Sequence, residues 1–333
     1  MSHFTVMVFG ENPEKQLLPF QENTCSKEFL EFVDKEDEMK GEYENKGSKR
    51  VIMPDGRKLL TWDDEFRVKG TYGMGSGTHK VPEYLKIEEI PFKELFSSFD
   101  EYAKEWCGYD SRDAEKGRYG YWSNPNSKWD WYQLGGRWRG FFRLKEKKYL
   151  PPIAGENGVF NKDKDVLEYA DQVKKANIDY EYMKLKAEAS ARETYQKIAL
   201  LFEGGSIPTI RKWTDCCEEG TRIGRSIEDT RTCYGEQPAV KIFNENEKKF
   251  NLGFFASLDD FQMTEEEYAE QEALNSIVPF AVIRDGKWFE KGTMGWWGIV
   301  SDEKDEKVWI KEFWKMFKEL PDDTLISVFD CHI

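Results

Sequence analysis

Residues 122–140, WSNPNSKWDWYQLGGRWRG, combine indole rings, guanidinium groups and asparagine amides in one short stretch. Aromatic rings stack on nucleobases, at about 1–3 kcal/mol for each base, and arginine forks hold phosphate or carboxylate groups through paired hydrogen bonds. The stretch therefore contains the components of a pocket for a nucleotide or another phosphorylated small molecule. Its candidate ligand-binding residues are Asn124, Asn126, Lys128, Trp129, Trp131, Tyr132, Arg137, Trp138 and Arg139.

A second stretch rich in glycine and tryptophan, KGTMGWWGIV at 291–300, adds Trp296 and Trp297 as rings that either close over a ligand or fill the core. The first stretch also has an alternative interpretation. It would be a tryptophan-rich hairpin packed in the core, with its arginines stacked on rings or paired with acids. In that case the Asn-Pro-Asn sequence is a turn whose amides satisfy neighbouring backbone groups.

Two of the three histidines lie near the ends of the sequence. His3 begins a β-rich segment, and Asp330 and His332 share one face of the expected last strand. If these strands are neighbours, His3, Asp330 and His332 converge and could bind a divalent metal, which would suit phosphoester hydrolysis. The alternative is that the histidines bond to neighbours at the end of a sheet. No other cofactor is expected.

The six cysteines show no Cys-x-x-Cys spacing, which is typical of reduced thiols in a cytosolic protein. Cys331 is expected to be a buried structural thiol, because nothing in the sequence supplies a base to activate it. The group of Cys216, Cys217 and Cys233 allows at most a loose zinc site.

The composition limits the class of protein. The chain has 333 residues, of which 34% are charged and 15% aromatic, and its formal net charge is −14. This charge argues against general binding to nucleic acids, which requires Lys and Arg to displace counterions. The sequence contains no apolar run long enough to cross a bilayer, and its start does not resemble a signal peptide. We therefore expect a cytoplasmic protein without membrane contact.

Local patterns predict the elements that must position these residues. Alternating or continuous apolar runs predict strands at 3–9 and 324–333, and apolar residues at helical spacing predict helices at 92–106 and 307–320. Asp-Gly pairs predict hairpins, and the Gly-Gly pair predicts a turn between two β segments. These turns are centred on Asp55-Gly56, Asp285-Gly286 and Gly135-Gly136. The run AVKIF at 239–243 is β-like in an otherwise ambiguous region.

The order of these elements predicts an α+β fold with a mixed or antiparallel sheet that contains both terminal strands, packed helices and a long helical insertion. Residues 1–150 are expected to form an N-terminal α+β core that carries the Trp/Arg stretch. Residues 160–204 are expected to be the helical insertion, which ends before Gly205. Residues 205–333 should complete the same core.

Three segments together resemble a family of proteins encoded in bacteriophage and bacterial genomes. They are NPNSKWDWYQLGGRW at 124–138, the opening SHFTVMVFGENPEKQLLPFQEN, and the ending GWWGIVSDEKD…LPDDTLISVFDCHI. The resemblance covers about the first 145 and the last 55 residues, lengths within the range of domains. It implies a phage-linked, globular protein of the host cytosol, and it implies no catalytic residues.

Three functions are consistent with these patterns. The first is a binding protein that captures a nucleotide or other phosphorylated small molecule in a Trp/Arg pocket, as a counter-defence protein that sequesters an immune signal would. The second is a metal-dependent enzyme that acts on a phosphorylated substrate at His3, Asp330 and His332. The third is an acidic inhibitor that occupies a basic surface of a host defence nuclease.

Overall fold

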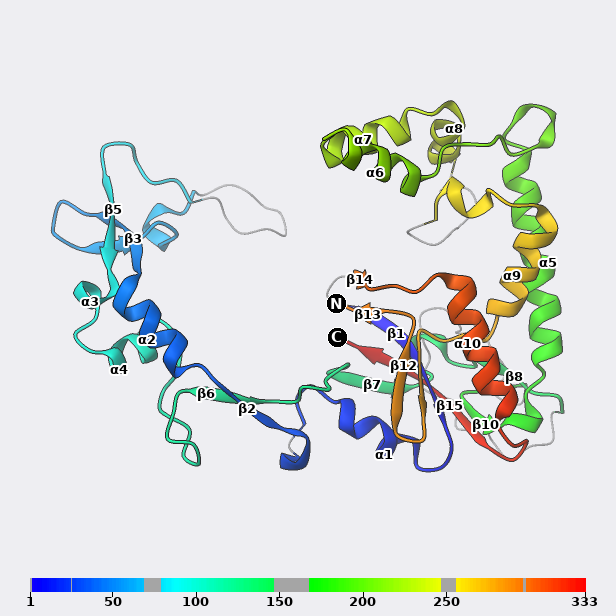
Figure 1. Cartoon of the computed structure of the whole chain (residues 1–333), viewed down its shortest axis with the longest axis horizontal. Coiled ribbons are helices and arrows are strands. Elements are labelled where there is room, and N and C mark those ends of the chain that lie inside the picture. The colour runs from blue at the N-terminus through cyan, green and yellow to red at the C-terminus, as the bar shows by residue number, and fades with distance from the viewer. Residues whose placement is uncertain (1, 25, 69–78, 147–167, 247–255, 296–297) are drawn as a thin grey trace. The chain divides into compact units, whose positions relative to one another are not determined.

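The chain forms two compact units. The computed structural model describes residues 2–24, 26–68, 79–146, 168–246, 256–295 and 298–333. Unit 1 contains Met1–Gln21 and Ser127–Ile333, and unit 2 contains Glu22–Asn126 (Figure 1). This division differs from the expected one, because residues 22–126 have a core of their own instead of belonging to the core of residues 1–150.

Unit 1 is built on a six-stranded mixed sheet that contains both terminal strands, which confirms the predicted α+β fold. The first and last strands are antiparallel neighbours, with register from His3 opposite His332 to Phe9 opposite Ile326. Both ends of the described chain therefore lie side by side in Figure 1, and the Ser2 N–H donates to the carbonyl of Ile333. The strand order is β10 (Gln172–Lys174), β15 (Leu325–His332), β1 (His3–Phe9), β11 (Ala281–Arg284) and β12 (Lys287–Glu290), with β7 (Trp131–Leu134) also paired to β15.

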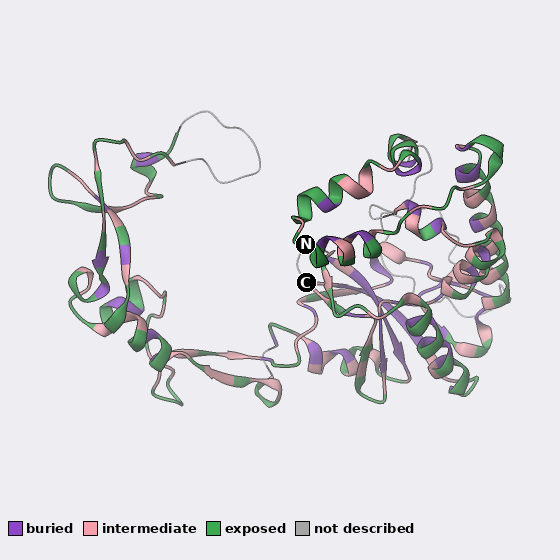
Figure 2. Ribbon diagram, turned by 45° about the horizontal axis from the view of Figure 1, so that its top comes forward, coloured by how far each residue is buried: buried purple, intermediate pink, exposed green. Residues whose placement is uncertain are grey.

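Both faces of β1 are buried, so its sequence is almost continuously apolar. Met7 and Phe9 contribute to a cluster with helix α10 (Glu306–Glu319), which presents Phe313 and Phe317 to the sheet. Residues of the other face belong to a second cluster that includes Trp129. Figure 2 shows the buried residues concentrated along these strands. The predicted helix over 307–320 and the hairpin at Asp285-Gly286, formed by β11 and β12, are confirmed.

The segment expected to be helical from residue 160 to 204 is only partly so. Helix α5 (Tyr180–Ala199) is long and packs against α9 (Glu265–Asn275). Before it, β9 (Tyr169–Ala170) pairs with β8 (Phe142–Arg143), and β10 joins the main sheet. The expectation of helix at 169–174 is therefore wrong, because tertiary strand pairing overrides local helical preference there.

The described residues between α5 and α9 include helices and no strand. They include α6 (Trp213–Arg222), α7 (Ile227–Gly235) and α8 (Pro238–Asn246). The β-like run AVKIF is thus part of α8, whose Ala239, Val240 and Phe243 share one buried helical face. The remaining short hairpin of unit 1 pairs β13 (Thr293–Met294) with β14 (Val300–Ser301).

The two β segments around Gly135-Gly136 do not form the expected hairpin. β7 pairs with β15, whereas β8 pairs with β9, so the chain leaves one sheet and enters another across these glycines. In the part of the chain that the structure describes, no helix has both the length and the apolar character that a membrane crossing requires.

Unit 2 combines two small sheets with short helices. β2 (Glu31–Asp34) pairs with β6 (Gly120–Ser123), and the hairpin predicted at Asp55-Gly56 joins β3 (Gly47–Ile52) to β4 (Lys58–Leu60). Unit 2 also contains β5 (Lys86–Pro91), which pairs with β3, and the α-helices α2 (Glu36–Asn45), α3 (Phe92–Leu95) and α4 (Phe99–Glu105).

The helix predicted over 92–106 is interrupted between α3 and α4. Ser98 begins α4 by accepting a hydrogen bond from the Glu101 N–H, so it acts as a cap inside the periodic run.

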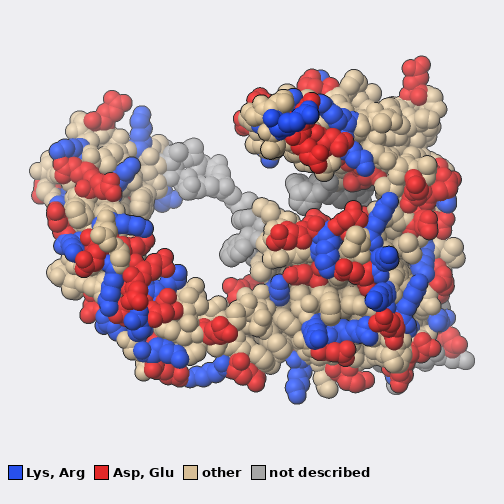
Figure 3. Space-filling model, in the orientation of Figure 1, with Lys and Arg blue, Asp and Glu red and all other residues tan. Residues whose placement is uncertain are grey.

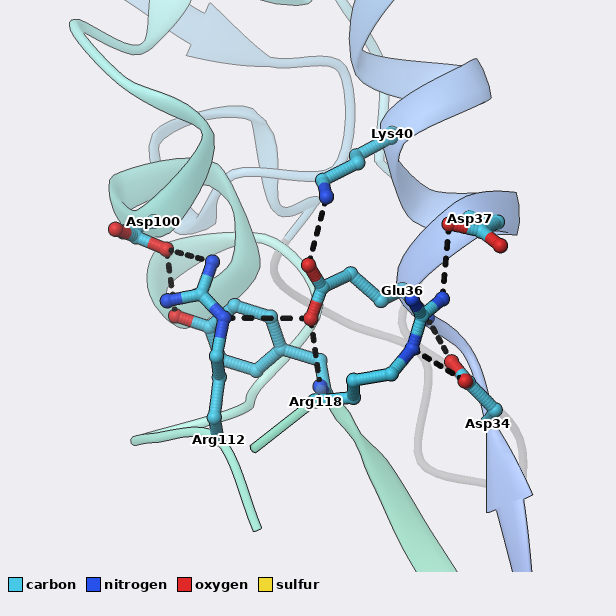
Figure 4. Close-up of polar contacts among 8 residues, drawn as sticks. Asp34, Glu36, Asp37, Lys40, Asp100, Arg112 and Arg118 are labelled. Carbon is cyan, nitrogen blue, oxygen red and sulfur yellow. Dashed lines mark hydrogen bonds and ion pairs between the residues drawn. The ribbon is translucent and has the colours of Figure 1, made fainter. Parts of the chain in front are cut away.

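A buried carboxylate joins the elements of unit 2. The Glu36 side chain accepts hydrogen bonds from Lys40 Nζ at 2.7 Å, the Tyr119 backbone N–H at 3.1 Å and Arg112 Nε at 3.3 Å (Figure 4). Arg112 and the Tyr119 hydroxyl both contact Asp100. The hydrogen bond from Lys40, helped by that from Tyr119, lowers the pKa of Glu36 to about 2.

We predict that Glu36→Gln lowers the free energy of unfolding of unit 2 by about 1–3 kcal/mol at pH 7, because it removes charge-assisted hydrogen bonds. A depressed pKa stabilises the fold above the unfolded pKa, near 4.5, and this contribution disappears as the pH falls towards 2. The protection factors of amides in α2 and α4 of the full chain, taken relative to the intrinsic exchange rate at each pH, should therefore fall below pH 4.5 in the wild type and depend less on pH in the variant.

The matched control is Glu38→Gln on the same helix, which removes only the exposed ion pair with Lys35. We expect it to change stability by less than about 0.5 kcal/mol. Equal protection of the two variants from exchange would contradict the role given to Glu36.

Candidate functional site

The ends of three neighbouring strands bring the two terminal histidines together. In the pairing of β7, β15 and β1, Trp131 lies opposite His332, and His332 lies opposite His3. Residues opposite one another in paired strands point to the same face, so the three rings form a row across the sheet. The next row of the same face contains Asp330, opposite Thr5.

Each histidine is held by its own carboxylate. His3 Nδ1 lies 2.8 Å from Asp330 Oδ1, and His332 Nδ1 lies 2.7 Å from Asp130 Oδ1. The two imidazoles meet edge to face, with ring centroids 4.9 Å apart. We call His3, His332, Asp130 and Asp330 the histidine cluster.

The geometry of the histidine cluster suits proton transfer. A carboxylate accepts from a protonated Nδ1, so each pairing favours the tautomer whose Nε2 is a free acceptor. Among the described residues, neither His3 nor His332 has a hydrogen-bond partner at Nε2. Each histidine side chain is 14% exposed, whereas the side chain of Asp330 is only 2% exposed. Each ring is thus held at Nδ1 by a carboxylate and is partly exposed to solvent.

The loop over residues 135–141, called the glycine loop here, is attached to two buried carboxylates. The Arg137 backbone N–H donates to Asp330 Oδ2 at 2.9 Å, and the Phe141 N–H donates to Asp171 Oδ1 at 3.0 Å. Asp330 therefore joins the glycine loop to His3, because its Oδ1 contacts His3 and its Oδ2 accepts from the loop backbone.

The glycines of this loop are required by the close approach of these carboxylates. Gly135 and Gly136 have φ values of +69° and +46°, a region that favours glycine. A Cβ at Gly136 would lie 2.3 Å from Asp330 Cβ, and one at Gly135 would lie 2.3 Å from Asp171 Oδ2. The Gly-Gly pair thus serves packing against two acids instead of turning a hairpin.

The glycine loop carries two arginines whose guanidinium groups have no acidic partner among the described residues. Arg137, Trp138 and Arg139 are all half-buried. In the described ranges, no carboxylate forms an ion pair with the guanidinium of Arg137 or Arg139. In the alternative interpretation the arginines stack on rings or pair with acids, and among the described residues neither kind of contact is present for Arg137 or Arg139.

The predicted aromatic residues divide between surface and core. Trp131 is 49% exposed, and its ring centroid lies 6.4 Å from that of His3. Trp129 is only 2% exposed and packs with Tyr132, which also contacts Phe329. β7 begins at Trp131, so Trp129 precedes the strand and the two rings do not share a strand face. Trp129 has the alternative role, that of a core residue.

The remaining predicted ligand residues lie in other settings. Lys128 pairs with Glu290 at 2.7 Å. Asn124 and Asn126 belong to unit 2, where the Asn126 N–H donates to Asn124 Oδ1 in the expected turn. Trp296 and Trp297 lie outside the described residues.

The structure brings His3, Asp330 and His332 together and adds Asp130, which was not predicted, as the partner of His332. Asp130 stands directly before β7, and only the register of β7 on β15 places it beside His332. No local sequence signal reports that register. Cys331 points to the opposite face, where complete burial raises the pKa of its thiol, as suits a structural residue.

Two further observations bear on the predicted sites. Among the described residues, no group of three or more His, Cys, Asp and Glu side chains has the geometry to hold a metal ion. Four surface cavities of 400–570 Å³ are lined by described residues, and none of these four includes a predicted ligand-binding residue. The nucleotide pocket and the metal site therefore stay predictions.

No family model matches the sequence, and neither a curated protein nor a solved structure matches the chain.

We predict that Gly136→Ala destabilises unit 1 by about 2–4 kcal/mol, because the methyl group both strains the backbone and displaces Asp330. Gly224→Ala is the matched control, since Gly224 has a φ of +69° but open space around it, and we expect it to cost about 1 kcal/mol. Urea unfolding of both variants measures the difference. Equal costs would show that the contact with Asp330 has no energetic weight.

Proposed function

We propose that unit 1 binds a phosphorylated small molecule, such as a nucleotide, at the histidine cluster and catalyses acid–base cleavage of its phosphoester. The observation that carries this proposal is the pair of carboxylate-oriented imidazoles in edge contact. General acid–base catalysis by positioned histidines contributes typically 10²–10⁴-fold to a rate.

Each imidazole would have one role in the reaction. One Nε2 accepts a proton from water as its oxygen attacks phosphorus, and the other imidazole, in its protonated form, gives a proton to the leaving oxygen. One P–O bond forms and the ester P–O bond breaks, so the pair ends with one proton between them, as it began. Asp130 and Asp330 act as positioning residues, because they fix Nδ1 of each ring.

The choice of a phosphorylated ligand is supported by the surroundings of the histidine cluster. The backbone of Arg137 contacts Asp330, and the guanidinium of Arg137 is unpaired within the described ranges, so it can serve a phosphate. The exposed ring of Trp131, beside His3, offers a surface on which a base can stack.

Capture of a nucleotide without turnover is the second candidate, favoured by the same exposed Trp131 and by Arg137, which forms no ion pair with any described residue. As a phage protein, the chain would then sequester an immune signal of the host. The metal-dependent form of the enzyme is a third version, in which His3 and His332 would hold a divalent ion through Nε2. The ion would supply an activated water, and each carboxylate would orient its ligand from Nδ1.

We predict that the purified protein hydrolyses bis(p-nitrophenyl) phosphate or p-nitrophenyl phosphate with a bell-shaped dependence on pH. His3→Asn and His332→Asn should each lower kcat at least 100-fold, since an amide can still bond to the carboxylate but cannot exchange the proton. His79→Asn in unit 2 is the matched control and should leave the rate unchanged. Release of p-nitrophenolate, followed by absorbance, is the measurement.

Two additional measurements separate the candidates. Persistence of the rate in EDTA, with no metal found by elemental analysis, favours the metal-free reaction, and restoration of the rate by manganese or zinc favours the metal-dependent one. No hydrolysis, together with a nucleotide released by heating the purified protein and identified by mass spectrometry, would leave capture as the function. If the protein shows no turnover, releases no nucleotide on heating and has no affinity for ATP in titration calorimetry, this use of the site is ruled out.

A further inference from the structure

Helix α10 carries a row of lysines that is unusual for so acidic a chain. The row consists of four exposed lysines that follow one another at spacings of four, four and three residues, so they lie along one side of the helix. Among the described residues, none of these four has a carboxylate within ion-pair distance, although the chain has a net charge of −14. They are Lys307, Lys311, Lys315 and Lys318.

These lysines line a groove between α9 and α10. Its cavity volume is about 570 Å³, within the 300–1,000 Å³ typical of small-molecule sites. The apolar floor is made by Ile310 and Trp314 from α10 and Leu274 from α9. Trp314 is 7% exposed and is fixed by a hydrogen bond from its Nε1 to the carbonyl of Leu274. Figure 3 shows Lys and Arg side chains grouped over this part of the surface.

The two ends of the groove differ in charge. Glu267 and Glu270 contribute to the lining of one end. The pKa of Glu267 is lowered first by the hydrogen bond from the Thr264 N–H and also by the positive charge of Lys307. The end with Trp314 is cationic. Lys318 Nζ lies 6.0 Å and Lys184 Nζ 4.6 Å from the centroid of the Trp314 ring.

We propose that this groove binds an anionic amphiphile, a small molecule with a carboxylate, sulfate or phosphate head and an apolar body. The apolar body lies on Ile310, Trp314 and Leu274, and the head lies among the lysines at the Trp314 end. Charge complementarity favours this occupant over an acidic peptide helix, because a helix with acids along its length would also face Glu267 and Glu270.

The groove shares no residue with the histidine cluster, so it gives unit 1 a second ligand class that is independent of the proposed function. The helix faces that form the groove are set by the packing of α10 on the sheet and of α9 on α5, so the groove is preformed.

Titration calorimetry of the full chain with dodecanoate, below its micelle concentration and at low salt, tests this inference. We expect saturable binding at one site, no heat from acetate, and at least tenfold weaker binding of dodecyltrimethylammonium, which has the same apolar body and the opposite charge. Higher salt should weaken the binding of dodecanoate, because the lysines are exposed.

The variant Lys311→Gln/Lys318→Gln should bind dodecanoate at least tenfold more weakly. The matched control Lys49→Gln/Lys58→Gln removes two exposed lysines of unit 2 and should change the affinity by less than twofold. Leu274→Gln, at a half-exposed position of the floor, tests the apolar part and should also weaken binding even if the lysine variant fails to fold. Absence of dodecanoate binding by the wild type, equal binding of the cationic amphiphile, or equal affinity of all variants would overturn the proposal.

Discussion

The antiparallel pairing of β1 with β15 is the interaction on which unit 1 depends. It places the first and last described strands in the middle of the six-stranded sheet, and α10 packs over one of its faces. It also sets His3 opposite His332, so the histidine cluster is a direct result of strand register. A shift by one residue would turn the apolar side chains of one face to the other and would separate each histidine from its carboxylate.

The same region depends on acids that are buried beneath a loop. Asp330 bonds to His3 with one oxygen and to the backbone of Arg137 with the other, and Asp171 holds the end of the glycine loop. Buried carboxylates are costly unless their oxygens are bonded. Gly135 and Gly136 allow the backbone to come close enough to make those bonds. The backbone position of Arg137 and the orientation of the His3 imidazole are therefore fixed by a single carboxylate, that of Asp330.

Much of the fold was predictable because its signals are local. The apolar runs of β1 and β15, the two Asp-Gly hairpins and the periodic face of α10 each lie within a few residues of sequence. The convergence of His3, Asp330 and His332 followed from strand parity once the strands were assumed to be neighbours. The pairing of Asp130 with His332 was not predictable, because it requires the register of β7 on β15 across the sequence. Nor was the burial of Trp129 beside the exposed Trp131, since it depends on the residue at which β7 begins.

The placement of unit 2 between β1 and β7 has a consequence for the order in which the protein matures on the ribosome. Unit 2 is a continuous segment, so all of its contacts are complete once residue 126 has left the exit tunnel. β1 is made earlier, yet its antiparallel partner β15 is made only after residues 10–324. Pairing across so large a sequence separation is intrinsically slow. The nascent chain therefore carries a complete unit 2 while the apolar β1 still lacks its β15 partner, and an unpaired apolar strand is prone to aggregation during this interval.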